Sequence, residues 1–112
     1  MDMTRETIGD VLVLTPQVEY LDAGNSKDFR RELSDLVSPR AKVVLDLGRV
    51  QFVDSSGCGT LLYYLRQLSA VGGDVKLCAL NRPVRALFEM IRLQRVFEIF
   101  NTKDEAVRAY QV

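Results

Sequence analysis

The chain contains no histidine among its 112 residues. Histidine is the usual base that activates a serine or cysteine nucleophile, and it is a common zinc ligand. A Ser-His-Asp or Cys-His site therefore cannot form within one chain, and a zinc site would have too few good ligands. We expect a protein that is not an enzyme and that has no catalytic residues, metal or cofactor.

Cysteine is scarce as well, since Cys58 and Cys78 are the only two and no Cys-x-x-Cys spacing joins them. This pattern favours neither a disulfide framework nor a metal site. We expect two free thiols that are buried or half-buried. Cys58 is interpreted as a small apolar side chain, because no histidine is available to activate it.

The chain also lacks net charge, because fifteen basic residues balance fifteen acidic ones. Its overall field therefore attracts neither nucleic acid nor an anionic membrane surface, and partner recognition must be local. No apolar run approaches the roughly 20 residues that span a bilayer, and residues 1–6 lack the apolar segment of a secretory signal. We expect a cytoplasmic protein.

Apolar residues make up 47% of the chain and charged residues 27%. These fractions are those of an ordinary soluble globular protein, so disorder is not expected. The length fits one compact domain, residues 1–112, with no room for a second core.

Short β-prone runs are separated by turn residues. Gly9 and Asp10 predict the turn of an opening hairpin, and a nearly continuous apolar run follows later in the chain, as is typical of a strand buried on both faces. Strands are expected at residues 4–8, 11–15, 42–47, 75–80 and 97–100.

Apolar residues at helical spacing predict three helices, and Thr102 with Glu105 has the capping-box spacing that begins a short fourth one. The first helix is expected to end near residues 38–39 and the second to run from about 56 to 72. The expected buried faces are Leu61, Leu62, Leu65 and Leu68 in the second helix, and Val84, Leu87, Phe88 and Ile91 in the third. This order predicts an α/β fold, a mixed central β-sheet with about four helices packed against it.

Asp22 and Asn25 precede the first helix. Asp and Asn are common N-caps, so capping is the first interpretation of both. If this helix packs beside the centre of the chain, the same two side chains could also contact a partner.

Asp46 interrupts an apolar strand, and two interpretations are open. It could accept a phosphoryl group as in a receiver domain, or it could lie at a sheet edge or bond to neighbouring backbone. We prefer the second, because the acidic pair expected near the first strand of a receiver is missing.

The centre of the chain is the hexapeptide Asp54-Ser55-Ser56-Gly57-Cys58-Gly59, between an apolar strand and a leucine-rich helix. Ser, Asp and Gly are typical of a helix start, so the hexapeptide is interpreted as a strand-to-helix turn. A serine hydroxyl here would be exposed at the positive end of the helix dipole, beside unpaired N–H groups. Such a position favours a phosphate.

Other motifs do not fit the hexapeptide. The third glycine of a dinucleotide-binding fingerprint would fall on Leu62, and neither a nucleophile elbow nor a phosphate-binding loop with Gly-Lys-Ser/Thr is present. These motifs therefore do not predict a nucleotide site, and whether the turn binds a nucleotide stays open.

The strand, the hexapeptide and the leucine-rich helix together resemble the signature of STAS-domain anti-sigma factor antagonists, also called anti-anti-sigma factors. The resemblance extends to Leu21-Asp22-Ala23 and to residues 81–97, and so covers nearly the whole chain. Two features depart from the family pattern. Cys58 stands where an aliphatic residue is common, and residues 18–20 lack a glycine often found there.

This resemblance implies a STAS-type single domain that acts by partner switching. In the family, the serine directly after the motif aspartate is phosphorylated by a partner that is both a serine protein kinase and an anti-sigma factor. By position this is Ser55, with Ser56 as the second choice. The unmodified protein would bind that partner and free a sigma factor for transcription, phosphorylation would end the binding, and a phosphoserine phosphatase would restore it. The implied partner-binding residues are Asp22, Asn25, Asp54, Ser55, Ser56, Gly57, Cys58 and Gly59.

Two alternatives remain open. The protein could be a non-switching STAS scaffold or accessory subunit of a larger complex. It could also be a small hydrolase with Ser55 as nucleophile or a receiver with Asp46, but the missing histidine and the missing acidic pair disfavour these enzymes.

Overall fold

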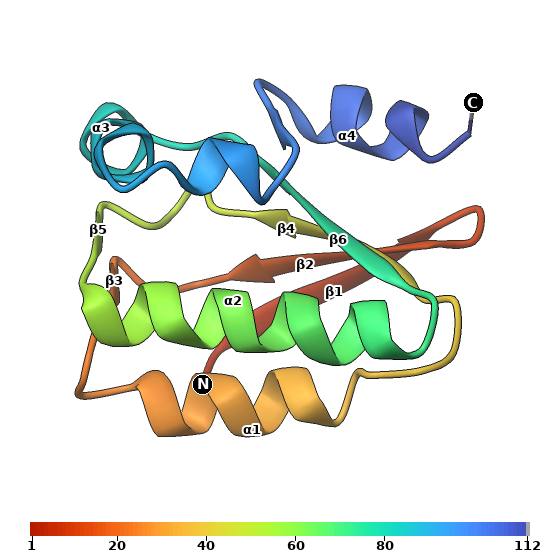
Figure 1. The fold of residues 1–112 in the computed structure, drawn as a ribbon, viewed down its shortest axis with the longest axis horizontal. Coiled ribbons are helices and arrows are strands. Elements are labelled where there is room, and N and C mark those ends of the chain that lie inside the picture. Colours follow the sequence, from red (N-terminus) through yellow and green to blue (C-terminus); the bar gives the residue numbers. More distant parts are fainter. Residues whose placement is uncertain (112) are drawn as a thin grey trace.

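The computed structural model describes residues 1–111, in which helices cover both faces of a five-stranded sheet (Figure 1). The strand order is β1-β2-β4-β6-β7. β1 pairs antiparallel with β2, and all other neighbours pair in parallel, so the sheet is mixed as predicted. The strands are β1 (Met3–Ile8), β2 (Val11–Pro16), β4 (Lys42–Asp46), β6 (Asp74–Cys78) and β7 (Ile99–Phe100).

Within residues 1–111, three α-helices and one 3-10 helix lie between strands, and a fourth α-helix follows β7. In Figure 1, α1 and α2 run side by side below the sheet, while α4 lies above it. The helices are α1 (Ser26–Ser34), α2 (Ser55–Ala70), α3 (Arg82–Met90), η1 (Leu93–Arg95) and α4 (Lys103–Ala109).

The central strand β4 explains the nearly continuous apolar run. Val43 and Leu45 belong to the large core under α1, α2 and α3, whereas Val44 belongs to a smaller core with Ala106 and Val107 of α4. Successive side chains of a strand point to opposite faces, so a strand covered on both sides must be apolar at every position.

A second, two-stranded sheet was not predicted. β3 (Tyr20–Leu21) and β5 (Phe52–Val53) pair in parallel, with Leu21 opposite Val53. The pairing places the loop before α1 beside the turn before α2, and so brings the two helix starts together.

The first helix ends at Ser34, about four residues before the predicted end. Leu36 follows in a turn and Val37 in irregular chain, yet both still pack against the core, which explains why their spacing resembled a continuing helix. In α2 the buried side is formed by Leu61, Tyr64 and Leu68, whereas the predicted Leu62 and Leu65 are only half-buried. Tyr64 is fully buried, and its hydroxyl is satisfied there by donating a hydrogen bond to the Leu36 carbonyl oxygen at 3.4 Å.

Two local predictions are confirmed. Thr102 caps α4 by accepting a hydrogen bond from the Glu105 N–H at 3.2 Å, and its hydroxyl donates to the Glu105 carboxylate at 3.1 Å. Asp46 bonds to neighbouring backbone, since its Oδ1 accepts from the Gly48 N–H at 2.9 Å. None of the helices within residues 1–111 combines the length and apolar character that crossing a membrane requires.

Candidate functional site

Asp54 holds the start of α2. Its Oδ1 accepts a hydrogen bond from the Gly57 N–H at 3.0 Å, which makes it the N-cap. Its Oδ2 accepts a second bond from the Ala23 N–H at 3.1 Å. One carboxylate therefore fixes both the first turn of α2 and the loop before α1.

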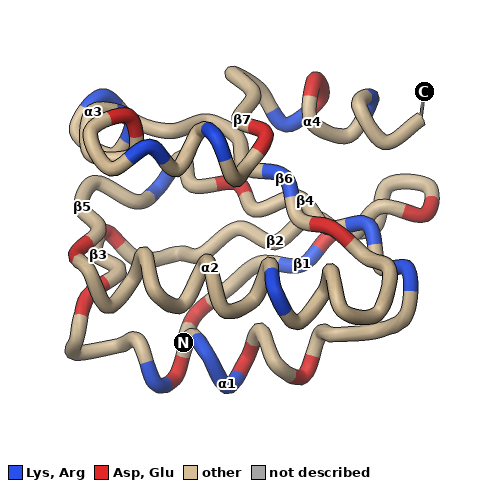
Figure 2. The backbone as a smooth tube through the Cα atoms, viewed as in Figure 1, with Lys and Arg blue, Asp and Glu red and all other residues tan. Residues whose placement is uncertain are grey.

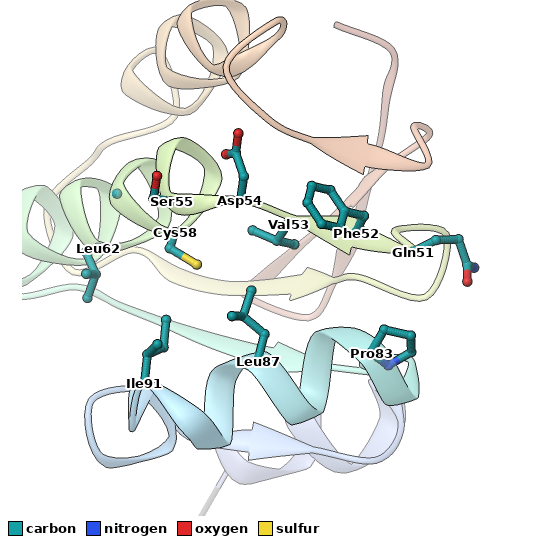
Figure 3. Close-up of a pocket in the computed structure, with 11 residues that line it drawn as sticks. Gln51, Phe52, Val53, Asp54, Ser55, Cys58, Leu62, Pro83, Leu87 and Ile91 are labelled. Carbon is teal, nitrogen blue, oxygen red and sulfur yellow. The ribbon is translucent and has the colours of Figure 1, made fainter.

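Ser55 is the first residue of α2 and is exposed, as expected from the sequence. The N–H groups of a first helical turn have no carbonyl partner within the helix, so the hydroxyl lies beside free donors. In Figure 3 the Ser55 oxygen points to the same side as the Asp54 carboxylate, toward α1, whereas Cys58 points toward α3. Ser56 is half-buried, and its carbonyl oxygen accepts a hydrogen bond from the Thr60 hydroxyl at 3.1 Å.

The two glycines of the hexapeptide differ in their surroundings. Gly57 is buried, and a Cβ atom at that position would lie 2.6 Å from the Leu21 carbonyl oxygen and 2.8 Å from Val53 Cγ1. Gly59 is half-buried, and a Cβ atom there would have no neighbour within 4 Å. Gly57 is therefore explained by close packing against the small β3–β5 sheet, which leaves only Gly59 at the surface.

Cys58 is 6% exposed, and Cys78 is fully buried. Burial raises the pKa of the Cys58 thiol, and the nearby negative charge of Asp54 raises it further. Both causes favour the neutral thiol, which agrees with its interpretation as a small apolar side chain.

Asn25 occupies the N-cap position of α1, as interpreted, but its side chain makes no capping hydrogen bond, and Asp22 lies outside the cap. Asn25 donates from Nδ2 to the Tyr20 carbonyl oxygen at 2.7 Å and accepts from the Asp22 N–H at 3.1 Å. Asp22 accepts from the Gly24 N–H at 2.9 Å. The backbone of the β3–α1 loop uses these side chains first, and they shape the loop that contacts Asp54.

Two cavities meet at Ser55. The larger is an apolar groove of about 620 Å³ between α2 and α3, with Cys58 and Leu62 on one side and Leu87 and Ile91 on the other (Figure 3). The smaller, of about 410 Å³, is lined by Ser26, Lys27 and Arg30 of α1 and by Ser55, Ser56 and Gly59 of α2. We call these the apolar groove and the basic pocket.

The sequence did not indicate either cavity. Leu87 and Ile91 were assigned to the core, but Leu87 is half-buried and Ile91 is 46% exposed, because α3 buries only its Val84 and Phe88 side. Helical spacing could have shown that these two residues lie one turn apart. Lys27 and Arg30 lie three residues apart in α1, a spacing equally typical of an ordinary solvated face.

Positive charge in the basic pocket comes from α1 alone, since α2 carries a single charged residue, Arg66, well along the helix (Figure 2). No group of three or more histidine, cysteine, aspartate or glutamate side chains within residues 1–111 is placed to hold a metal ion.

Known proteins match this chain over nearly all of its length. The family model described as STAS domain matches residues 2–106. BtrV of Bordetella bronchiseptica, whose name proposes an anti-sigma factor antagonist, is 30% identical over 99% of this chain and 96% of its own. An anti-sigma F factor antagonist of Paenibacillus polymyxa is 30% identical over 82% of this chain and 80% of its own.

Solved structures share the fold. A protein of Thermotoga maritima, whose name proposes an anti-sigma factor antagonist, superposes with a TM-score of 0.89 at 24% identity, over 98% of this chain and 95% of its own. The anti-sigma factor antagonist SpoIIAA in its unphosphorylated form superposes with a TM-score of 0.77 at 24% identity, over 99% of this chain and 98% of its own. The phosphorylated form of SpoIIAA from Bacillus superposes with a TM-score of 0.69 at 23% identity, over 97% of this chain and 99% of its own.

The family match, the relatives and the common fold agree, and we conclude that this chain belongs to the STAS domain family, together with its relatives named anti-sigma factor antagonists.

Proposed function

We propose that the protein is a partner-switching regulator whose switch is the Ser55 hydroxyl. Unmodified, it binds an anti-sigma factor that is also a serine protein kinase and so frees a sigma factor for transcription. Phosphorylation of Ser55 ends the binding, and a phosphoserine phosphatase restores it. The observation that carries the proposal is the exposed Ser55 hydroxyl at the first position of α2, between the apolar groove and the basic pocket.

Names of relatives support the class of partner, because anti-sigma factor antagonists act on anti-sigma factors. A protein of the same fold is known in a phosphorylated form, which supports modification as the switching signal.

Ser55 is preferred to Ser56 for a physical reason. A kinase must bring the serine oxygen into line with the γ-phosphorus of ATP, which requires an open approach. Ser55 is exposed and borders both cavities, whereas Ser56 is half-buried in the first turn of α2 and borders only the basic pocket. Ser56 remains the second choice.

In the proposed reaction this chain supplies only the nucleophilic oxygen. A bond forms between Ser55 Oγ and the γ-phosphorus of ATP, the bond from that phosphorus to the bridging oxygen breaks, and ADP leaves. The hydroxyl proton passes to a base of the kinase. The product carries about −1.5 to −2 charges where there was none.

The proposed partner surface is the exposed part of the hexapeptide with the loop that Asp54 holds. Asp22, Asn25 and Asp54 shape that surface through their hydrogen bonds to backbone. Ser55, Ser56 and Gly59 form its centre and Cys58 lines the adjoining groove, while Gly57 contributes by letting α2 pack closely on β3. Apolar side chains of the partner would fit the groove, where burying apolar area gives about 25 cal/mol per Å².

Loss of binding needs only a modest energy. A penalty of about 3 kcal/mol weakens an affinity roughly a hundredfold. Bulk, desolvation of a dianion and repulsion by nearby Asp54 all contribute to such a penalty, without any refolding of the domain.

We further infer that residues 1–112 act as one STAS domain in the cytoplasm, where ATP and sigma factors are present. The balance of fifteen basic and fifteen acidic residues gives no general attraction to nucleic acid, so control of transcription passes through the partner protein.

The test is phosphorylation in solution. The immobilised protein is used to capture its kinase from the source organism without ATP, and the complex is then given ATP. Mass spectrometry should find phosphate on Ser55, and the captured kinase should elute as phosphate accumulates. Stable capture with no phosphate on Ser55 or Ser56 would instead favour the alternative, a non-switching scaffold.

A further inference from the structure

The basic pocket lies between the starts of α1 and α2, and the Ser55 hydroxyl is on its edge. Ser26, Lys27 and Arg30 form one wall, while Ser55, Ser56 and Gly59 form the other. In Figure 3 the Ser55 oxygen points to the α1 side, away from the apolar groove. A group attached to that oxygen therefore extends toward the basic pocket.

Both cations of the pocket are free to accept an anion. Lys27 and Arg30 are exposed, and neither has an ion-pair partner within residues 1–111. The neighbouring carboxylate Asp28 lies 3.7 Å from Arg31 instead. The Arg30 guanidinium is stacked over the Tyr63 ring, 4.7 Å from its centre. Stacking restricts the side chain in advance, so less conformational entropy is lost when an anion binds.

The negative groups nearby are Asp54 and Asp22, and both carboxylates already accept hydrogen bonds from backbone N–H groups. The Asp54 oxygens accept from the Gly57 and Ala23 N–H groups, and Asp22 accepts from the Gly24 N–H. They remain negatively charged, however, and repel a dianion on Ser55. Because the Ser55 oxygen points to the same side as the Asp54 carboxylate, the attraction of Lys27 and Arg30 must offset this repulsion.

We propose that Lys27 and Arg30 receive the phosphate on Ser55, so that the modified protein carries an ionic bridge from α2 to α1. This inference rests on the proposed function, because it concerns the same hydroxyl. The phosphate fills the pocket and neutralises two cations that the unmodified surface offers to a partner. Partner release is then caused by a filled and neutralised pocket as well as by repulsion.

The test places phosphoserine at residue 55 during translation, so that no kinase is needed. The second pKa of this phosphate is measured by ³¹P NMR at near-physiological salt, where charges more than about 8 Å away are largely screened. Cations favour the dianion, so the pKa should lie below the ordinary value of about 6. In the double variant Lys27→Gln/Arg30→Gln it should rise by roughly half a unit to one unit.

A matched double variant, Arg31→Gln/Arg66→Gln, removes two exposed charges from the same two helices outside the pocket and should leave the phosphate pKa unchanged. Lys27→Arg keeps the charge and should keep the pKa low. Equal pKa values for the two double variants would overturn the inference. The phosphate is installed without a kinase, so this result does not depend on the capture experiment. Failure of the kinase to phosphorylate Ser55 in the capture experiment would overturn the proposed function and leave this measurement unaffected.

Discussion

Asp54 Oδ2 accepts a hydrogen bond from the backbone N–H of Ala23, 31 residues earlier in the chain, at 3.1 Å. The other oxygen of the same carboxylate caps α2 through the Gly57 N–H. The Asp54 side chain therefore adds to the β3–β5 pairing in holding the starts of α1 and α2 together beside the basic pocket.

Asp54→Ala should lower the free energy of unfolding by about 1–2 kcal/mol, because it removes an N-cap and a second hydrogen bond. Asp54→Asn should cost less. Its amide oxygen can still cap α2, but its NH₂ group faces the Ala23 N–H, and two donors cannot bond. Urea unfolding measures the first effect, and faster hydrogen exchange at Ala23 measures the second.

Asp28→Asn is the control for these variants, because Asp28 is exposed and its contact with Arg31 is a surface pair at 3.7 Å. Its effect should be at most about 0.5 kcal/mol. Wild-type stability of Asp54→Ala would show that the cap does not hold the helix starts together.

Ser55→Asp should weaken binding to the captured anti-sigma factor by roughly a hundredfold, since a fixed negative charge replaces a neutral hydroxyl at the centre of the proposed surface. Ser55→Ala should bind normally and resist phosphorylation. Isothermal titration calorimetry measures both affinities. Ser69→Asp adds the same charge at an exposed position near the other end of α2 and should bind like the wild type. Unchanged affinity of Ser55→Asp would contradict the switch.

The two glycines of the hexapeptide predict opposite effects of the same change. Gly57→Ala places a methyl group 2.6 Å from the Leu21 carbonyl oxygen, which belongs to the backbone and cannot move easily. It should destabilise the protein by about 1–3 kcal/mol despite the better helix propensity of alanine. Gly59→Ala meets no atom within 4 Å and should stabilise α2 by up to about 1 kcal/mol. Thermal unfolding of the two variants, Gly57→Ala and Gly59→Ala, tests this difference. Equal melting temperatures would refute the packing explanation for Gly57.

Much of this fold could be predicted from local patterns. Gly9 has the positive φ of 61° that a tight turn favours, and the apolar run in β4 correctly predicted a strand covered on both faces. Thr102 and Glu105 form the capping contact that their spacing indicated. The strand, the small polar residues and the leucines predicted a start of α2 at about residue 56, one residue after the observed start at Ser55. In each case the pattern that indicates the structure lies within a short stretch of sequence, so local chemistry is sufficient to predict it.

What could not be predicted depends on long-range pairing. β3 and β5 have two residues each, too few to show any periodicity, yet their pairing sets the site. Asn25 has the composition of a cap, but backbone groups of its own loop use its side chain. Lys27 and Arg30 form a pocket only because α1 turns that face toward α2, and residue types alone cannot show which face a helix turns to its neighbour.

Alkaline pH should destabilise the protein, because its buried acids are neutral in the folded state. Burial raises the pKa of Tyr64 from 10.0 to about 12, and burial with the nearby charge of Asp46 raises that of Cys78 from 9.0 to about 12. Burial also raises the pKa values of Cys58 and Tyr110. Each group loses its proton more easily in the unfolded chain, so their contribution is fully present below about pH 9 and is lost as the pH rises toward 12.

The onset of this loss identifies the groups. Thiols in the unfolded chain begin to ionise near their ordinary pKa of 9.0 and tyrosines near 10.0, so the wild type should weaken from about pH 9. Each ionising group contributes at most about 1.4 kcal/mol per pH unit. The variant Cys58→Ala/Cys78→Ala should be less stable at neutral pH but hold that stability up to about pH 10, where only the tyrosines remain. Urea midpoints measured across this range test the order, and a wild-type stability that stays constant up to about pH 11 would mean that these side chains reach solvent in the folded protein.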